Sequence, residues 1–195
     1  MTPDPTEALR VLLQVISAFE ELGVAYHLGG SYASSIHGVP RQTQDIDLVV
    51  DLHAAAIPAL CRRLERDFYC NEAALAAAVK SRGSANLVHF ESALKIDIFV
   101  LGAGAYDQEE FRRHQAQVLV RDPERHIFVK SAEDILLRKL EWYRTGGEVS
   151  DRQWSDILGI VKTQGQRLDR DYLLLWADRI GGRDLLAKVL PEESS

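Results

Sequence analysis

The pattern of apolar and polar residues at the start of the chain predicts a helix, a short strand and a second helix. Apolar residues recur at helical spacing over residues 6–22, where Thr6 can cap the helix and Gly23 can end it. The next apolar run, 24–28, is short enough for a strand and leads into a glycine turn, Gly29-Gly30-Ser31. A short helix is expected next, over residues 32–37.

Further strands are predicted by alternation and by apolar runs between residues 45 and 129. The stretch from Asp45 to Val50 alternates acidic and aliphatic residues before it becomes fully apolar, which is typical of a strand with one buried face. A β-hairpin is expected near Glu91 and Ser92, and a helical turn is expected to begin at Phe111. The remaining elements predicted here are helices over 54–66 and 73–80, the hairpin strands 85–90 and 94–101, and short strands over 117–120 and 127–129.

From Ser131 onward the pattern is helical only. Ser131 can cap a helix three residues before Asp134, and no strand-like run follows it. We therefore expect an α/β (α+β) protein with a mixed-sheet core at 1–130 and a C-terminal helical segment at 131–195 packed on that core. The last residues, 191–195, are expected to fray.

Composition and charge narrow the function classes. The chain has 195 residues, of which 46% are hydrophobic and 27% charged, as in ordinary folded domains. A net charge of −6 argues against a surface built to cover a nucleic-acid backbone. No apolar run approaches the roughly 18 residues of a membrane span, so no membrane association is expected. Because Cys61 and Cys70 form no Cys-x-x-Cys pair, we expect neither a disulfide nor a thiolate zinc site. A cytoplasmic location is expected for the same reason.

Two acidic residues on the predicted strand are candidate metal ligands. Asp45 and Asp47 are two residues apart, so their carboxylates project from the same face of the strand. Carboxylate pairs of this kind suit Mg²⁺ or Mn²⁺. With 15 aspartates in the chain, about one Asp-x-Asp pair is expected by chance, and a second pair, Asp169 and Asp171, is typical of an acidic helix start. The pair alone is therefore weak support for a metal site.

The surroundings of the pair strengthen the metal hypothesis. Ile46 and Leu48 hold the acidic strand in a core, where two adjacent carboxylates are costly unless a cation or water accepts their charge. A third acid, Asp97, lies in another aliphatic strand. The Gly29-Gly30-Ser31 turn precedes a helix N-terminus, where backbone N–H groups and a hydroxyl can bind phosphate. A simple turn is the alternative.

Together these motifs resemble the DNA polymerase β-type nucleotidyltransferase superfamily over residues 24–100. The matching order is Leu28-Gly29-Gly30-Ser31, then Arg41-Gln42-Thr43-Gln44-Asp45-Ile46-Asp47-Leu48, then Asp97. The resemblance implies a nucleotidyltransferase core. It further implies that the catalytic acids Asp45, Asp47 and Asp97 bind two Mg²⁺ or Mn²⁺ ions and that Gly29, Gly30, Ser31 and Arg41 bind a nucleoside triphosphate.

A second resemblance extends into the C-terminal helices. Lys139-Leu140 and Arg152-Gln153-Trp154-Ser155-Asp156-Ile157 are similar to motifs of the AbiEii-like abortive-infection nucleotidyltransferases, although Gln153 and Ile157 depart from them. This implies nucleotide-binding roles for Lys139 and Asp156. The alternatives are a solvated lysine and an intrahelical pair between Asp156 and Arg152. Trp142, Trp154 and Trp176, with Tyr143, are expected in the helical core rather than stacked on bases.

The function that these resemblances imply is transfer of a nucleoside monophosphate from a nucleoside triphosphate to an acceptor hydroxyl. The acceptor is a protein, a transfer RNA or a small molecule, and the setting is a toxin-antitoxin or phage-defence system with a cognate antitoxin or toxin partner. The alternatives are a non-catalytic nucleotide-sensing or antitoxin-like module and a structural partner in such a pair.

Overall fold

The computed structural model describes residues 5–43, 45–121 and 124–190, and the chain divides into two compact units. The first unit comprises residues 1–30 and 42–129, and the second comprises residues 31–41 and 130–195. The expected domains, 1–130 and 131–195 with the helical segment packed on the core, stay a prediction. The expected frayed tail at 191–195 lies outside the described residues.

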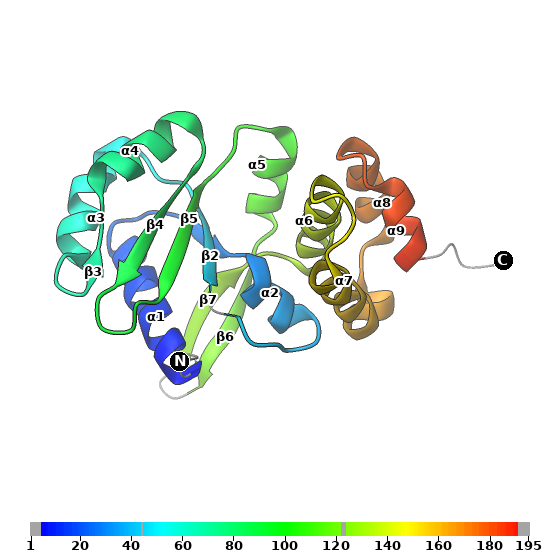
Figure 1. Cartoon of the computed structure of the whole chain (residues 1–195), viewed down its shortest axis with the longest axis horizontal. Coiled ribbons are helices and arrows are strands. Elements are labelled where there is room, and N and C mark those ends of the chain that lie inside the picture. Colours follow the sequence, from blue (N-terminus) through cyan, green and yellow to red (C-terminus); the bar gives the residue numbers. More distant parts are fainter. Residues whose placement is uncertain (1–4, 44, 122–123, 191–195) are drawn as a thin grey trace. The chain divides into compact units, whose positions relative to one another are not determined.

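In its described residues the first unit is built on a seven-stranded sheet with the order β3-β4-β5-β2-β1-β7-β6 (Figure 1). Strand β2 runs parallel to β5 and antiparallel to β1, and β1 runs parallel to β7. The expected mixed sheet is therefore confirmed. The strands are β1 (Tyr26–Leu28), β2 (Asp45–Val50), β3 (Phe68–Tyr69), β4 (Ser84–His89), β5 (Lys95–Val100), β6 (Gln115–Arg121) and β7 (Glu124–Val129).

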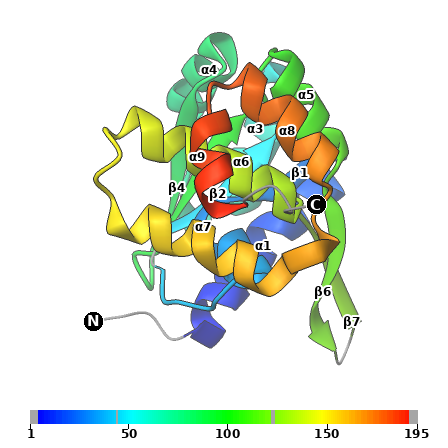
Figure 2. The same ribbon diagram turned by 90° about the vertical axis from the view of Figure 1, so that its right-hand side faces the viewer.

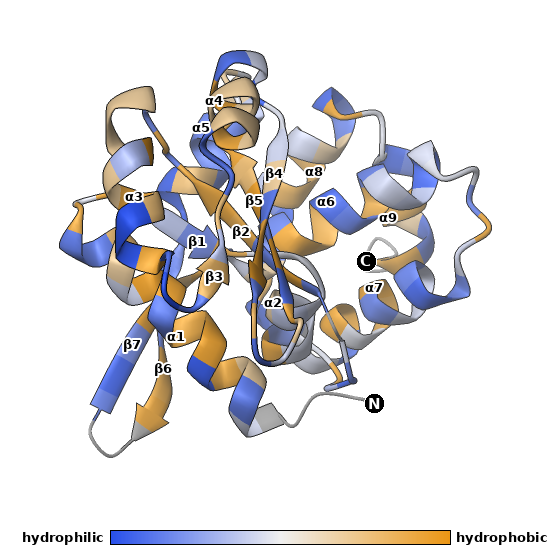
Figure 3. Ribbon diagram, turned by 60° about the vertical axis from the view of Figure 1, so that its left-hand side comes forward, coloured by the Kyte–Doolittle hydropathy of each residue, from blue (hydrophilic) through white to orange (hydrophobic). Residues whose placement is uncertain are grey.

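One face of the central strands is aliphatic and forms the core of the first unit. In Figure 1 the helices α1 (Pro5–Glu21), α3 (Ile57–Leu64) and α4 (Glu72–Ser81) lie on one side of the sheet and α5 (Ala105–Arg112) on the other. Helix α1 alternates hydrophobic and hydrophilic positions, and β2 and β5 are mostly hydrophobic (Figure 3). The side chains that β2 and β5 bury are Ile46, Leu48, Val50, Ile96, Ile98 and Val100.

Several local expectations are confirmed and others are wrong. The expected hairpin is present as the antiparallel pair β4 and β5, and the helix expected over 54–66 is a 3₁₀ turn at Ala54–Ala56 followed by α3. Phe111 does not begin a helix but lies near the end of α5, because the helix starts directly after Gly104. Strand β3 is only two residues long, too short for any periodicity, and was not expected.

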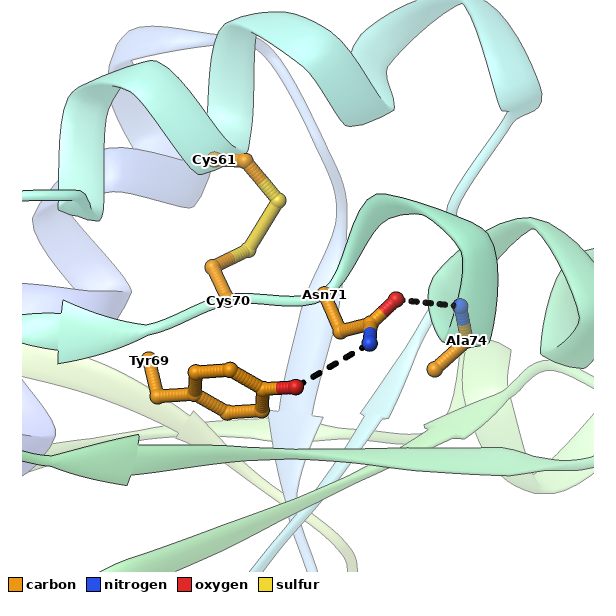
Figure 4. Close-up of a disulfide and its surroundings, with 5 residues drawn as sticks. All are labelled: Cys61, Tyr69, Cys70, Asn71 and Ala74. Carbon is orange, nitrogen blue, oxygen red and sulfur yellow. Dashed lines mark hydrogen bonds between the residues drawn. A yellow bond between two sulfur atoms is a disulfide. The ribbon is translucent and has the colours of Figure 1, made fainter.

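The expectation of no disulfide is wrong. Cys61, on α3, is bonded to Cys70, which follows β3, across a sequence separation of 9 residues (Figure 4). Asn71, the next residue, caps α4 by accepting a hydrogen bond from the backbone N–H of Ala74. Spacing arguments missed the pair because the fold brings the two cysteines together through the turn between α3 and β3.

The second unit is helical. In the order of the chain its helices are α2 (Gly30–His37), which begins at the last residue of the first unit, α6 (Ala132–Thr145), α7 (Asp151–Gln164), the 3₁₀ turn η2 (Gly165–Arg167), α8 (Arg170–Arg179) and α9 (Arg183–Val189). Helix α7 lies beside α6, and α9 beside α8 (Figure 2). The expected cap is confirmed, since the Ser131 hydroxyl accepts a hydrogen bond from the Asp134 backbone N–H.

The tryptophans of the second unit follow the expectation only in part. Trp176 is buried, whereas Trp142 is 60% exposed, so its expected place in the core is wrong. Trp154 lies against Tyr143 with ring centroids 5.0 Å apart. Among the described residues, no helix combines the length and the apolar character that crossing a bilayer requires. The cytoplasmic location stays a prediction.

Candidate functional site

The candidate metal ligands Asp45 and Asp47 lie on β2, at the centre of the sheet. Because side chains alternate along a strand, the buried Ile46 and Leu48 point to one face, and the two acids point to the other. The buried aliphatic residues thus fix the direction of the carboxylates, since a shift of one residue would move both acids into the core.

Asp97 joins the same face from the neighbouring strand. Strands β2 and β5 are parallel and in register, with Asp45 opposite Lys95 and Asp47 opposite Asp97. Adjacent strands lie about 4.8 Å apart, so Asp47 and Asp97 occupy directly neighbouring positions on this face. The burial pattern of β5 agrees, because Ile96 and Ile98 are buried while Asp97 is partly exposed. The tertiary pairing therefore brings the three acids onto one surface.

The glycine turn lies against Asp47. Gly30 has a φ of +55°, and a Cβ atom added to it would lie 1.7 Å from Asp47 Oδ2. The backbone N–H of Gly29 donates a 2.8 Å hydrogen bond to the carbonyl oxygen of Asp47. Only glycine permits both the left-handed backbone and this close approach. The Gly-Gly turn is therefore built to let the Asp47 carboxylate approach the main chain.

The sequence reasoning missed a fourth charged residue on the carboxylate face, Lys95. Its Nζ atom lies 2.9 Å from Asp97 Oδ2. The hydrogen bond to Asp97 raises the pKa of the Lys95 ammonium above its usual range, and the charges of Asp45 and Asp47 raise it further. The signal was present in the sequence, because Lys95 precedes Asp97 by two residues on the same strand and so shares its face.

The chemistry of the donor set fits a hard divalent cation. Carboxylate oxygens on one face, beside a turn that leaves no side chain in the way, are the ligands that Mg²⁺ and Mn²⁺ prefer. As they stand, no three His, Cys, Asp or Glu side chains of the described residues converge closely enough to form a metal-binding set. Holding a cation here therefore requires the carboxylates to rotate toward one another.

The other predicted residues form an ionic cluster in the second unit. Arg41 binds Asp156 through two hydrogen bonds, from Nε to Oδ1 at 2.7 Å and from Nη2 to Oδ2 at 2.8 Å. The same Nη2 donates to Ser31 Oγ at 2.6 Å. Two parallel bonds of this kind fix the plane of the guanidinium group. Asp156 thus positions Arg41 beside the hydroxyl of Ser31.

Lys139 completes this cluster from α6. Its Nζ atom lies 2.7 Å from Asp156 Oδ2 and donates a 3.0 Å hydrogen bond to Gln153 Oε1. The side chains of Lys139 and Asp156 are only 8% and 4% exposed. The alternative of a solvated lysine is therefore wrong, and Asp156 pairs with Arg41 and Lys139 instead of with its helix neighbour Arg152.

The electrostatics of this ionic cluster favour a permanently charged Asp156. Burial acts to raise the pKa of Asp156, but the hydrogen bonds from Arg41 and Lys139 outweigh it and lower the pKa below its usual range. The three side chains carry two positive charges and one negative charge. This surplus of one positive charge, beside the Ser31 hydroxyl, suits the binding of an anion such as phosphate.

Comparisons with known proteins identify the fold. No protein-family model matches the chain, and no curated protein sequence matches it. The solution structure of the antibiotic-resistance factor ANT(2'')-Ia matches with a TM-score of 0.56 and 12% identity, covering 95% of this chain and 99% of that one. A crystal structure of ANT(2'')-Ia in complex with adenylyl-2''-tobramycin matches with a TM-score of 0.50 and 14% identity, over 91% and 99% of the two chains.

A third solved structure supports the same assignment. An antigenic nucleotidyltransferase-like protein from Paracoccidioides brasiliensis matches with a TM-score of 0.51 and 15% identity, covering 91% of this chain and 90% of that one. At such identities structural similarity is informative about fold rather than about activity. The expected fold class is therefore confirmed: this chain has the mixed α/β fold of the nucleotidyltransferases.

Proposed function

We propose that this chain is a metal-dependent nucleotidyltransferase that transfers a nucleoside monophosphate from a nucleoside triphosphate to an acceptor hydroxyl. The observation that carries this proposal is the register of β2 and β5, which makes Asp47 and Asp97 direct neighbours with Asp45 on the same face. The close approach of the Gly30 backbone to the Asp47 side chain also supports the proposal, because a surface carboxylate with a purely structural role does not require a glycine beside it. The shared fold supports it as well.

The proposed reaction forms one bond and breaks another. The acceptor oxygen bonds to the α-phosphorus, the bond between that phosphorus and the bridging oxygen of pyrophosphate breaks, and the hydroxyl proton passes to water. Asp45, Asp47 and Asp97 would hold Mg²⁺ or Mn²⁺, which supplies neutralisation of negative charge and a lower pKa for the acceptor hydroxyl. The carboxylates also orient the reacting groups on a rigid sheet, and such positioning accounts for much of the catalysis in phosphoryl-type transfers.

Phosphate binding is assigned to the glycine turn and to the ionic cluster of the second unit. Gly29 and Gly30 let a triphosphate approach the main chain, and Ser31, Arg41 and Lys139 offer hydroxyl, guanidinium and ammonium donors. Asp156 acts here as a positioning residue, since it holds both cations by direct hydrogen bonds. Its loss should weaken nucleotide binding through Arg41 and Lys139.

A labelling experiment tests the proposed activity. Full-length protein is incubated with α-labelled nucleoside triphosphates, Mg²⁺ or Mn²⁺, and a cell extract that supplies the acceptor. Asp47→Asn should lower label transfer by about 100-fold or more, since it removes a charge from the reacting centre. Asp171→Asn is the matched control, because Asp171 belongs to the other Asp-x-Asp pair and is exposed on α8. Equal transfer by wild type and Asp47→Asn would refute the assignment of the site.

Ligand binding separates the enzyme from the nucleotide-sensing alternative. A triphosphate with Mg²⁺ at about 100 times its dissociation constant stabilises the folded protein by about 2.7 kcal/mol and raises the melting temperature. Stabilisation that Asp47→Asn abolishes, without transfer to any fraction of the extract, would favour a non-catalytic nucleotide-sensing module. Fractionation of the labelled extract into protein, RNA and small molecules identifies the acceptor class.

A more specific proposal is that the chain is an AbiEii-like enzyme in a toxin-antitoxin or phage-defence system. It is supported by the direct contact between Lys139 and Asp156, since the two residues that carry this resemblance form one ion pair. Expression of the chain alone, and together with the product of the adjacent gene, tests the setting. Growth arrest that the neighbour relieves and that Asp47→Asn prevents would support it, whereas normal growth in both cases would contradict it.

A further inference from the structure

Lys95 lies among the three carboxylates of the proposed metal site, on the same face of the sheet. It precedes Asp97 by two residues on β5 and is directly opposite Asp45 in the register with β2. On its other side, the register with β4 places it opposite Val88, which brings no opposite charge. Across its two neighbouring strands Lys95 therefore faces one acid and one uncharged residue.

The Lys95 ammonium binds an oxygen that a metal ion would use. The distance from Nζ to Asp97 Oδ2 is 2.9 Å, and the side chains of Lys95 and Asp97 are 42% and 19% exposed. A half-exposed lysine can swing its ammonium into water at little cost, because the stem is flexible and the head is readily hydrated. The Lys95 ammonium can therefore bind Asp97 and can also leave it for water.

An ammonium and a divalent cation compete for the same oxygen lone pairs and also repel each other. The Lys95 ammonium adds one positive charge to the face that carries the three acids, and it contacts Asp97 directly. Neighbouring carboxylates repel one another, and the ammonium that contacts Asp97 offsets part of this repulsion, so Lys95 stabilises the metal-free protein. The same charge opposes metal entry.

We propose that Lys95 is a tethered cation of the carboxylate site, which neutralises Asp97 in the metal-free protein and is displaced from it when a divalent cation binds. Lys95 thereby sets the metal concentration at which the site fills. This inference rests on the proposed function, since it takes Asp45, Asp47 and Asp97 to be metal ligands. It adds a residue that controls metal occupancy without being a ligand itself.

Direct metal binding tests the inference without any measurement of activity. Mn²⁺ is titrated into full-length protein, and free Mn²⁺ is followed by electron paramagnetic resonance. Lys95→Met should bind Mn²⁺ about tenfold more tightly than wild type, because a unit charge beside a divalent ion costs about that much affinity even under strong solvent screening. Lys95→Gln, which keeps a hydrogen-bond donor but no charge, should behave like Lys95→Met, and Lys95→Arg should stay within about threefold of wild type.

A melting experiment supplies the second measurement. In chelator, Lys95→Met should melt at a lower temperature than wild type, and saturation with Mn²⁺ should raise its melting temperature by more than that of wild type. Lys80→Met is the matched control: it makes the same charge change on α4, where Lys80 is exposed. The control should match wild type in both measurements.

The outcomes distinguish this inference from the proposed function. If wild type binds Mn²⁺ and Asp47→Asn does not, the metal site stands. Lys95→Met or Lys95→Gln with unchanged or weaker affinity then overturns the role of Lys95 alone. If wild type and Asp47→Asn fail alike to bind Mn²⁺, the proposed function and the inference fall together.

Discussion

Replacing Asp156 by asparagine should strongly destabilise the second unit. The carboxylate accepts hydrogen bonds of 2.7 and 2.8 Å from Arg41 and forms a 2.7 Å ion pair with Lys139, and its side chain is 4% exposed. Asparagine keeps the shape but removes the negative charge that the half-buried Arg41 and the buried Lys139 contact directly. Breaking a buried ion pair from one side costs about 3 to 5 kcal/mol. For a chain of this size, that corresponds to a fall in melting temperature of about 10 °C.

The variant Lys139→Met should be much less harmful than Asp156→Asn. It removes one buried cation and leaves Arg41 and Asp156 as a neutral pair with both parallel hydrogen bonds intact. Methionine also fills the space of the lysine stem, so we expect a loss of about 1 to 2 kcal/mol at most. Asp151→Asn is the control for Asp156→Asn, because Asp151 is an exposed residue in the first turn of the same helix.

The assay is thermal and urea unfolding of full-length protein from pH 7 down to pH 3. The pKa of Asp156 is lowered in the folded state, so its stabilising contribution is complete above the usual carboxyl pKa of about 4 and is lost as the pH falls below it. The stability gap between wild type and Asp156→Asn should therefore narrow below about pH 4. Equal effects of Asp156→Asn and Asp151→Asn, or a greater effect of Lys139→Met, would refute the buried-charge reasoning.

Three further predictions concern other parts of the chain. Gly30→Ala should displace the Asp47 carboxylate and weaken Mn²⁺ binding at least tenfold, because the added Cβ atom would lie 1.7 Å from Asp47 Oδ2. Gly23→Ala is the control: Gly23 has a φ of +65° and nothing within 4 Å of the added Cβ atom, so this variant should show only the backbone strain. Equal Mn²⁺ affinity of the two variants would contradict this account. Reduction of the Cys61–Cys70 disulfide, or the double variant Cys61→Ser with Cys70→Ser, should lower the free energy of unfolding by about 2.7 kcal/mol, because the unfolded chain gains the entropy of the opened loop. An unchanged midpoint of urea unfolding would show that the bond does not stabilise the fold. Burial lowers the pKa of His37, whose Nε2 donates a hydrogen bond to the Lys130 carbonyl oxygen. Below about pH 6.5 the unfolded chain therefore binds the proton more readily than the folded chain, and the free energy of unfolding falls. His37→Gln should flatten this part of the plot of unfolding free energy against pH, and an unaltered plot would rule out this contribution.

Alternation along single strands was sufficient to predict much of the candidate metal site. The aliphatic residues of β2 determine which way Asp45 and Asp47 point, and the same rule applies to Lys95 and Asp97 on β5. The glycine turn was equally local, because a left-handed residue between a strand and a helix calls for glycine. The helix cap at Ser131 could also be predicted from the sequence, since it depends only on residues within one helical turn.

Contacts between distant residues were decided only by the tertiary structure. The register that sets Asp47 beside Asp97 depends on how β2 pairs with β5, and the ion pairs of Asp156 depend on bringing Arg41 and α6 to α7. The disulfide between Cys61 and Cys70 and the exposure of Trp142 belong to the same class. Periodicity specifies the faces of single elements, but which faces meet depends on the free energy of packing summed over the whole chain, and no local window of sequence contains that sum.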